Sequence, residues 1–173
     1  MKPIMNNEFV PMTRRYPDLR KKVLERDAKV ANKLVVAWDI ERDPDKVLSI
    51  YLNNINNLSD ERYWELLRSV WILCGKVENV PLFRNLMSTN RDKRYYFSTP
   101  EEQKKLREMP EVLAVYRATN STDDRGISWT LSLEYAKWYK ETYFKNSIIA
   151  LAIPKNKVFA YIERNKESEI IIL

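Results

Sequence analysis

The chain has 173 residues, of which 45% are hydrophobic and 12% aromatic, and this suits one ordinary domain with its own core rather than a disordered segment. It has no histidine and only two glycines, Gly75 and Gly126, which excludes Ser-His and Cys-His catalysis, His-ligated zinc, the three-glycine dinucleotide fingerprint and the P-loop. The net charge of +6 favours acidic partners such as nucleic acid, an acidic protein or a polyphosphate, without choosing among them.

The first part of the chain, from Tyr16 to about Met109, is predicted to be helical. Its first apolar residues recur at spacings of three and four, which places them on one stripe of a helix. These residues are Leu19, Val23, Leu24, Val30, Leu34, Val35 and Trp38. We therefore expect an opening helix with one apolar face.

Two further helices are predicted from the residues at their ends. Asp43 followed by Pro44 has the form of an N-cap with proline at the first helical position. Ser59 starts a helix with a wide apolar face, and Gly75 is a natural stop for it. The single cysteine, Cys74, lies in this apolar stretch and is expected to be a packed thiol in a reducing cytosol.

The character of the sequence changes after one more short helix. Residues 99–102, Thr-Pro-Glu-Glu, form a capping box, so a helix should run from them to about Met109. Runs rich in Val, Ile, Tyr and Phe then predict strands at 112–119, 127–130, 148–153, 158–163 and 170–173. The sequence thus predicts an α+β fold, in which a helical N-terminal region (1–110) packs on a compact mixed β-sheet core (111–173) as one unit.

One helix is expected to interrupt the strands. Ser132 caps it, and Tyr135, Trp138 and Tyr139 share a face at helical spacing. We expect this aromatic face to pack on the sheet.

Arg117 lies inside the otherwise apolar strand at 112–119. A charge there is costly unless an anion pairs with it, and the guanidinium fork suits a phosphate or a carboxylate. An exposed strand position or a structural ion pair is the alternative explanation.

Two pairs of polar residues follow Arg117. Ser128 and Thr130 are two apart in a short strand, so their hydroxyls project to one side and can orient a neighbouring carboxylate. Glu167 lies at a loop edge and Glu169 at the entrance of the last apolar strand, where burial can desolvate its carboxylate. Each pair also has a purely structural explanation. The first would be part of a strand that leads into a helix capped by Ser132, and the second would be a charged turn that favours solubility.

Taken together and in this order, the three stretches resemble the arginine, serine-x-threonine, glutamate-x-glutamate branch of the mono-ADP-ribosyltransferase superfamily. The resemblance covers about residues 113–173 and uses Arg117, Ser128 to Thr130 and Glu167 to Glu169. It implies an enzyme that cleaves NAD, needs no metal, and transfers ADP-ribose to a protein side chain, with arginine as the favoured acceptor. The middle hydroxyl of the family's serine-threonine-serine stretch is replaced here by Trp129.

The resemblance also implies a role for each residue. Glu169 would bind the ribose 2'-hydroxyl of NAD as oxocarbenium charge develops during nicotinamide release. Arg117 would hold the NAD phosphates or the adjacent ribose, Ser128 would hydrogen-bond Glu169, and Thr130 would support the pocket wall. Glu167 would orient and help deprotonate an incoming guanidinium.

Three aromatic residues have less definite roles. Trp129 either covers the nicotinamide or packs in the core. The resemblance implies an aromatic residue that stacks on the nicotinamide beyond the helix, and Tyr143 and Phe144 are its candidates.

The expected partners are NAD and a target protein, and a membrane is not expected. The start Met1-Lys2-Pro3-Ile4 has no apolar leader, and the longest apolar run, 148–153, is too short to span a bilayer. We therefore expect a cytoplasmic protein, such as a phage or bacterial effector. Two alternatives stay open: a basic nucleic-acid- or protein-binding module without NAD chemistry, and an NAD glycohydrolase.

Overall fold

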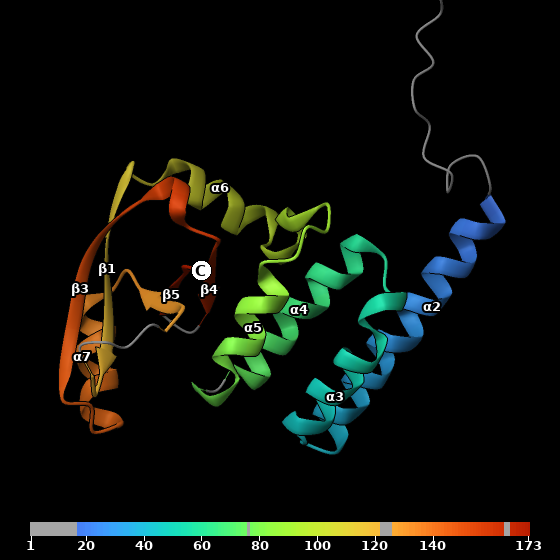
Figure 1. The fold of residues 1–173 in the computed structure, drawn as a ribbon, viewed down its shortest axis with the longest axis horizontal. Helices are drawn as coiled ribbons and strands as arrows, with labels where there is room; N and C mark the ends of the chain where they lie inside the picture. The colour runs from blue at the N-terminus through green and yellow to red at the C-terminus, as the bar shows by residue number, and fades with distance from the viewer. Residues whose placement is uncertain (1–16, 76, 122–125, 165–166) are drawn as a thin grey trace, which may run out of the picture.

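The computed structural model describes residues 17–75, 77–121, 126–164 and 167–173. The predictions for the chain start at Met1 and for a helix beginning at Tyr16 lie outside these residues. Within them, six α-helices and a five-stranded antiparallel sheet form an α+β fold, as the sequence predicts. Figure 1 shows the sheet at one end of the molecule and the first helices at the other.

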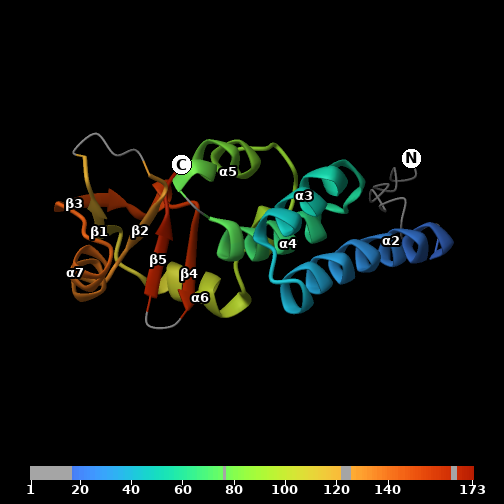
Figure 2. The same ribbon diagram turned by 90° about the horizontal axis from the view of Figure 1, so that it is seen from below.

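The opening helix, α2 (Pro17–Val35), continues into a π-helical segment, Val36–Ile40. Its predicted apolar stripe is only partly buried. Val30 and Leu34 belong to the core, whereas Leu24 is 56% exposed. Figure 2 shows the reason, because the first turns of α2 extend beyond the neighbouring helices.

The next helices form the centre of the helical part. They are α3 (Pro44–Asn54), α4 (Asp60–Cys74) and α5 (Val80–Met87). Asp43 caps α3 by accepting a hydrogen bond from Lys46 N at 2.9 Å, and Ser59 caps α4. Gly75 ends α4 as predicted, whereas α5 was not predicted as a separate helix. Short 3₁₀ helices lie at Ile55–Asn57, Val77–Asn79, Arg94–Phe97 and Lys155–Lys157.

The five strands follow in the order β3-β1-β2-β5-β4 across the sheet. Their bounds are β1 (Val112–Thr119), β2 (Ser128–Thr130), β3 (Ser147–Pro154), β4 (Ala160–Arg164) and β5 (Glu167–Ile171). The last strand begins earlier than predicted, so Glu167 and Glu169 lie inside it rather than before it. Pairing on both sides of β5 extends the strand backwards, since Glu169 pairs with Thr130 of β2 and Ile162 of β4.

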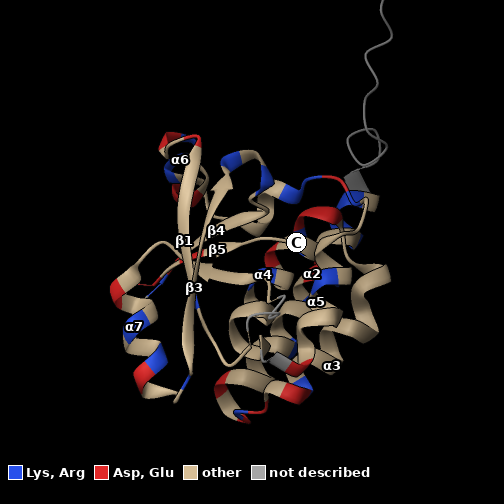
Figure 3. Ribbon diagram, turned by 60° about the vertical axis from the view of Figure 1, so that its left-hand side comes forward, with Lys and Arg blue, Asp and Glu red and all other residues tan. Residues whose placement is uncertain are grey.

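Two further helices border the sheet, α6 (Pro100–Glu108) before β1 and α7 (Leu133–Thr142) after β2. The capping box of α6 and the Ser132 cap of α7 form as predicted. Both helices carry acidic and basic residues, as Figure 3 shows, so neither presents a purely basic surface. No helix among the described residues is long and apolar enough to cross a membrane.

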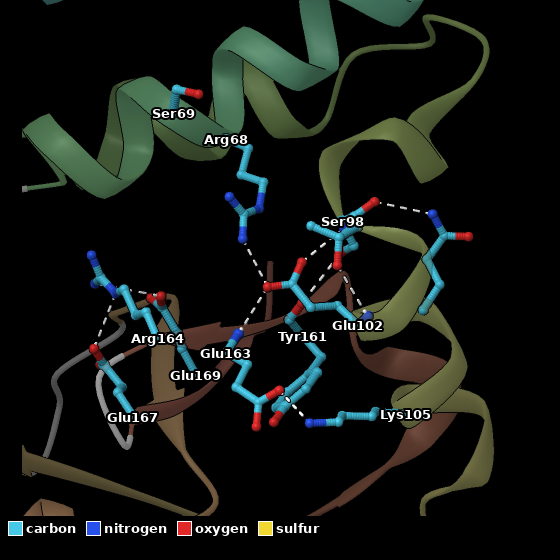
Figure 4. Close-up of polar contacts among 12 residues, drawn as sticks. Arg68, Ser69, Ser98, Glu102, Lys105, Tyr161, Glu163, Arg164, Glu167 and Glu169 are labelled. Atoms are coloured by element: carbon cyan, nitrogen blue, oxygen red, sulfur yellow. Dashed lines mark hydrogen bonds and ion pairs between the residues drawn. The ribbon is translucent and has the colours of Figure 1, made fainter.

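Glu102 of α6 ties the helical part to the sheet (Figure 4). Its carboxylate accepts hydrogen bonds from Arg68 Nη2 of α4 at 2.8 Å, from Glu163 N of β4 at 2.9 Å and from Thr99 N at 2.8 Å. Only 4% of this residue is exposed. One buried side chain therefore fixes α4, α6 and β4 relative to one another.

Two hydrophobic clusters lie on opposite sides of the sheet. The larger one contains α2–α5 side chains together with Ile127, Ala160, Ile162 and Ile171. The smaller one contains Leu113, Val115, Trp129, Val158, Tyr161 and Ile170. Since side chains alternate along a strand, Glu169 shares the Ile171 side of β5 and faces the helical part.

Candidate active site

A cavity of about 850 Å³ lies between α4, α7 and the sheet. The lining includes Trp71, Arg117, Ser128, Tyr135, Trp138, Tyr139, Tyr143, Arg164, Glu167 and Glu169. Its volume falls within the range of about 300–1,000 Å³ that is usual for small-molecule sites. The structure therefore brings six of the predicted site residues to one cavity: Arg117, Ser128, Trp129, Thr130, Glu167 and Glu169.

Glu169 is fully buried at the centre of this site. Its Oε1 accepts hydrogen bonds from Ser128 Oγ at 2.6 Å and from Trp71 Nε1 at 3.1 Å. Its Oε2 has no hydrogen-bond partner within the described part of the chain, and the nearest cation is Arg164 Nη2 at 3.6 Å. One oxygen is thus held in place, and the other is buried with unused capacity to accept a hydrogen bond.

Burial is the largest influence on the Glu169 carboxyl, and it raises its pKa above the ordinary 4.5. The hydrogen bond from Ser128, the charge of Arg164 and the hydrogen bond from Trp71 lower the pKa, whereas the neighbouring Glu167 carboxylate raises it. The net direction is upward. The carboxylate is therefore poorly solvated when ionised, which strengthens its interaction with any positive charge that develops beside it.

Trp71 joins the site from the helical part. It is 98 residues away from Glu169 in sequence, and its indole N–H reaches the carboxylate across the interface between α4 and the sheet. The sequence predicts a wide apolar face for this helix, to which Trp71 belongs, but no contact with the site. No local pattern marks an indole N–H as the donor to a distant carboxylate, so only the packing of α4 reveals it.

Arg164 is a second site residue that sequence analysis missed. Its Nε donates to Glu167 Oε2 at 3.1 Å and its Nη1 to the carbonyl of Ile72 at 3.3 Å, while Nη2 faces Glu169 (Figure 4). Arg164 and Glu167 are partners in the β4–β5 ladder. The two opposite charges, close together in the sequence, could have indicated this pair, because opposite charges at facing positions of neighbouring strands attract each other.

Arg117 lines the cavity from β1, and its Nη1 donates to the carbonyl of Ser128 at 2.7 Å. Gly126 permits this position. A Cβ at Gly126 would lie 2.1 Å from Arg117 Cζ, so any larger residue would push the guanidinium away. Here the glycine is required by a close approach rather than by its backbone angles.

The aromatic face of α7 lines the cavity instead of packing fully on the sheet, which corrects the prediction. Trp138 is 50% exposed, and the buried residue of α7 is Ala136. The pKa of Tyr135 is raised to about 12, mainly by burial and also by the neighbouring Glu167 carboxylate. Tyr135 therefore stays a neutral phenol next to Glu167 near neutral pH.

Three predicted residues make contacts that the sequence did not indicate. Trp129 packs in the smaller core cluster, with its indole N–H donating to Gly126 O at 3.1 Å, and it also contributes to the cavity lining. Thr130 Oγ1 accepts from Ser132 N at 3.1 Å and fixes the turn into α7. Phe144 is 89% exposed, does not line the cavity and has a φ of 51°, because the backbone turns outward where α7 ends. Its neighbour Tyr143 does line the cavity.

No protein-family model, curated protein or solved structure matched this chain. The chemistry available in the cavity follows from its own side chains. It combines a buried carboxylate that has one oxygen without a hydrogen-bond partner among the described residues, a second carboxylate paired with a guanidinium, another guanidinium on β1, and an aromatic wall. Such a site can stabilise a cationic transition state and hold an anionic group nearby.

Proposed function

We propose that the protein is an NAD-dependent mono-ADP-ribosyltransferase, which transfers ADP-ribose to a protein side chain, with arginine as the expected acceptor, and releases nicotinamide. One observation carries the proposal. Ser128 and Trp71 hold Oε1 of the fully buried Glu169, and Oε2 has no hydrogen-bond partner within the described residues. A carboxylate arranged in this way is ready to accept a hydrogen bond from a substrate hydroxyl.

The chemistry of NAD cleavage matches this carboxylate. Breaking the bond between ribose and nicotinamide develops oxocarbenium-like charge on the ribose, as in glycoside hydrolysis. A carboxylate that binds the 2'-hydroxyl interacts more strongly as this charge grows, and so lowers the barrier. Ser128 and Trp71 act as positioning residues, because they fix the Glu169 rotamer before the substrate binds.

Other cavity residues suit the remainder of the substrate. NAD carries two phosphates and two flat rings. Arg117 offers a guanidinium fork for a phosphate oxygen, and Lys145 adds a second positive charge to the lining. Tyr139 and Tyr143, whose ring centroids are 4.3 Å apart, offer flat surfaces for a ring.

Glu167 is the candidate for accepting the proton of the acceptor side chain. It lies two residues before Glu169 in β5, so both carboxylates project from the same face of the strand. It is largely buried, at 16% side-chain exposure, and it already contacts one guanidinium, that of Arg164. Glu167→Gln should therefore spare nicotinamide release and abolish transfer to protein.

The decisive experiment incubates the pure protein with labelled NAD and a cell lysate, and follows both nicotinamide release and label on protein. Glu169→Gln is compared with Glu163→Gln, which makes the same change on β4 at an exposed residue outside the cavity. We expect loss of both signals in Glu169→Gln alone. Release without label would indicate an NAD glycohydrolase, and no release from the unaltered protein would overturn the proposal.

A further inference from the structure

The guanidinium of Arg164 lies between the two carboxylates of the site (Figure 4). Two of its three nitrogens are held, Nε by Glu167 Oε2 at 3.1 Å and Nη1 by Ile72 O at 3.3 Å. The third, Nη2, forms no hydrogen bond within the described residues and is 3.6 Å from Glu169 Oε2. The side chain is 34% exposed, so it is anchored but accessible.

This arrangement matches what the proposed transfer requires of an acceptor. The acceptor needs a guanidinium bound by Glu167, with one nitrogen directed toward the carboxylate that would bind the ribose. We propose that Arg164 is itself an acceptor, and that the protein transfers ADP-ribose from NAD to Nη2 of its own Arg164. The inference rests on the proposed function and adds a modification site to it.

The bonds and protons of this step balance. The bond between the ribose C1 and the nicotinamide nitrogen breaks, and its electron pair neutralises the ring, so neutral nicotinamide leaves. Glu167 takes the Nε proton that it already binds, which turns the guanidinium into a neutral guanidine, and the electron pair on Nη2 forms the new bond to C1. This bond restores the positive charge, and one proton moves from Nη2 to Nε to give the substituted guanidinium. Glu167 then releases the proton it took to solvent, so the net products are ADP-ribosyl-arginine, nicotinamide and one proton.

The position of Arg164 explains why it would react before arginines elsewhere on the surface. It is preorganised in the site, whereas an external arginine must first bind there and lose its freedom of motion. Since the catalytic residues and the acceptor belong to one molecule, the modified fraction should grow, at a fixed NAD concentration, at a rate that does not change when the protein is diluted.

The test is intact-mass spectrometry of the pure full-length protein after incubation with NAD, followed by fragmentation to locate the adduct. Arg164→Lys keeps a positive charge between Glu167 and Glu169 but removes the guanidinium. Arg107→Lys makes the same change at an exposed residue outside the cavity. We expect one ADP-ribose unit on Arg164 in the unaltered protein and in Arg107→Lys, and none in Arg164→Lys.

Nicotinamide release, measured in the same samples, separates the two proposals. Release without an adduct, an adduct that fragmentation places on another residue, or a modification rate that falls on dilution would overturn the role of Arg164 and leave the NAD chemistry standing. No release from the unaltered protein would overturn both. Because fragmentation locates the adduct in the unaltered protein, the result does not depend on whether Arg164→Lys folds normally.

Discussion

Glu169 carries the proposed chemistry of the site, and its ionised form also destabilises the fold. A carboxylate with no exposed surface cannot be hydrated when it ionises. Its raised pKa means that the folded protein keeps a proton that the unfolded chain releases. As the pH rises from about 4.5 through the raised pKa, this group lowers the free energy of unfolding, by at most about 1.4 kcal/mol per pH unit. Ionisation is also what the proposed chemistry needs, so activity should rise over the same pH range.

Glu169→Gln should remove this pH dependence, because the amide does not titrate. Urea unfolding at a series of pH values should show the free energy of unfolding falling with pH in the unaltered protein and less steeply in the variant. Glu163→Gln should follow the unaltered protein. Identical pH profiles for Glu169→Gln and the unaltered protein would show that this carboxyl has an ordinary pKa.

Trp71→Phe tests whether the indole N–H positions the Glu169 carboxylate and favours its ionised form. Losing a hydrogen bond to a charged group costs about 1.5–3 kcal/mol, so nicotinamide release should fall by about 10- to 100-fold. The pH profile of release should also move to higher pH, since the Trp71 hydrogen bond lowers the Glu169 pKa.

Trp64→Phe is the matched control for this change. Trp64 is fully buried and donates its indole N–H to Asp92 O at 2.7 Å, outside the cavity lining. Trp64→Phe should lower the free energy of unfolding without shifting the pH profile of nicotinamide release. An equal shift in both variants would mean that Trp71 acts through general packing.

Gly126→Ala should displace the Arg117 guanidinium, because the new Cβ would lie 2.1 Å from its Cζ. We expect KM for NAD to rise with a smaller change in kcat, because Arg117 is proposed to bind the phosphates. The double variant Gly126→Ala/Arg117→Ala should bind NAD no more weakly than Arg117→Ala alone. Additive losses would show that Gly126 acts independently of Arg117.

At the scale of elements, Glu102 connects α4, α6 and β4. Glu102→Ala removes the N-terminal capping interaction of α6 and leaves Arg68 and the Glu163 backbone N–H without this acceptor. Breaking a buried pair of this kind costs about 3–5 kcal/mol, so the urea midpoint should fall with little change in the m-value. Glu101→Ala, the adjacent and exposed position in the same turn, should lie within about 0.5 kcal/mol of the unaltered protein.

The helix α7 shows how far an element can be predicted before its environment is known. The Ser132 cap and the spacing of Tyr135, Trp138 and Tyr139 indicate a helix with an aromatic face, and the helix forms there. Periodicity says which residues share a face, but not whether that face meets a core or a cavity. Only the position of α7 beside the cavity answers this.

At the scale of the whole molecule, the helical part and the sheet share one core. Ile127, Ile162 and Ile171 of the sheet region lie in the same cluster as Trp64 and Leu67 of α4. We therefore expect one cooperative unfolding transition, with fluorescence and circular dichroism changing together. A chain cut down to residues 111–173 should fail to fold, as its amide spectrum would show. A well-dispersed spectrum from that fragment would mean that the sheet does not need the helices.

Features that depend on neighbours in the chain could be predicted from the sequence alone. The caps at Asp43, Ser59, Thr99 and Ser132, and the apolar runs of the strands, give the α+β class because each acts over a few residues. The order and spacing of the arginine, hydroxyl and glutamate motifs also pointed to the residues that now line one cavity.

The groups that surround Glu169 follow from the packing of distant elements alone. Trp71 and Arg164 contact its carboxylate, Phe144 turns away to solvent, and the start of β5 depends on pairing with β2 and β4. The physical reason is the same in each case. A buried polar group takes its partners from whatever the packing of distant elements brings within hydrogen-bond distance, and no local sequence pattern encodes that choice.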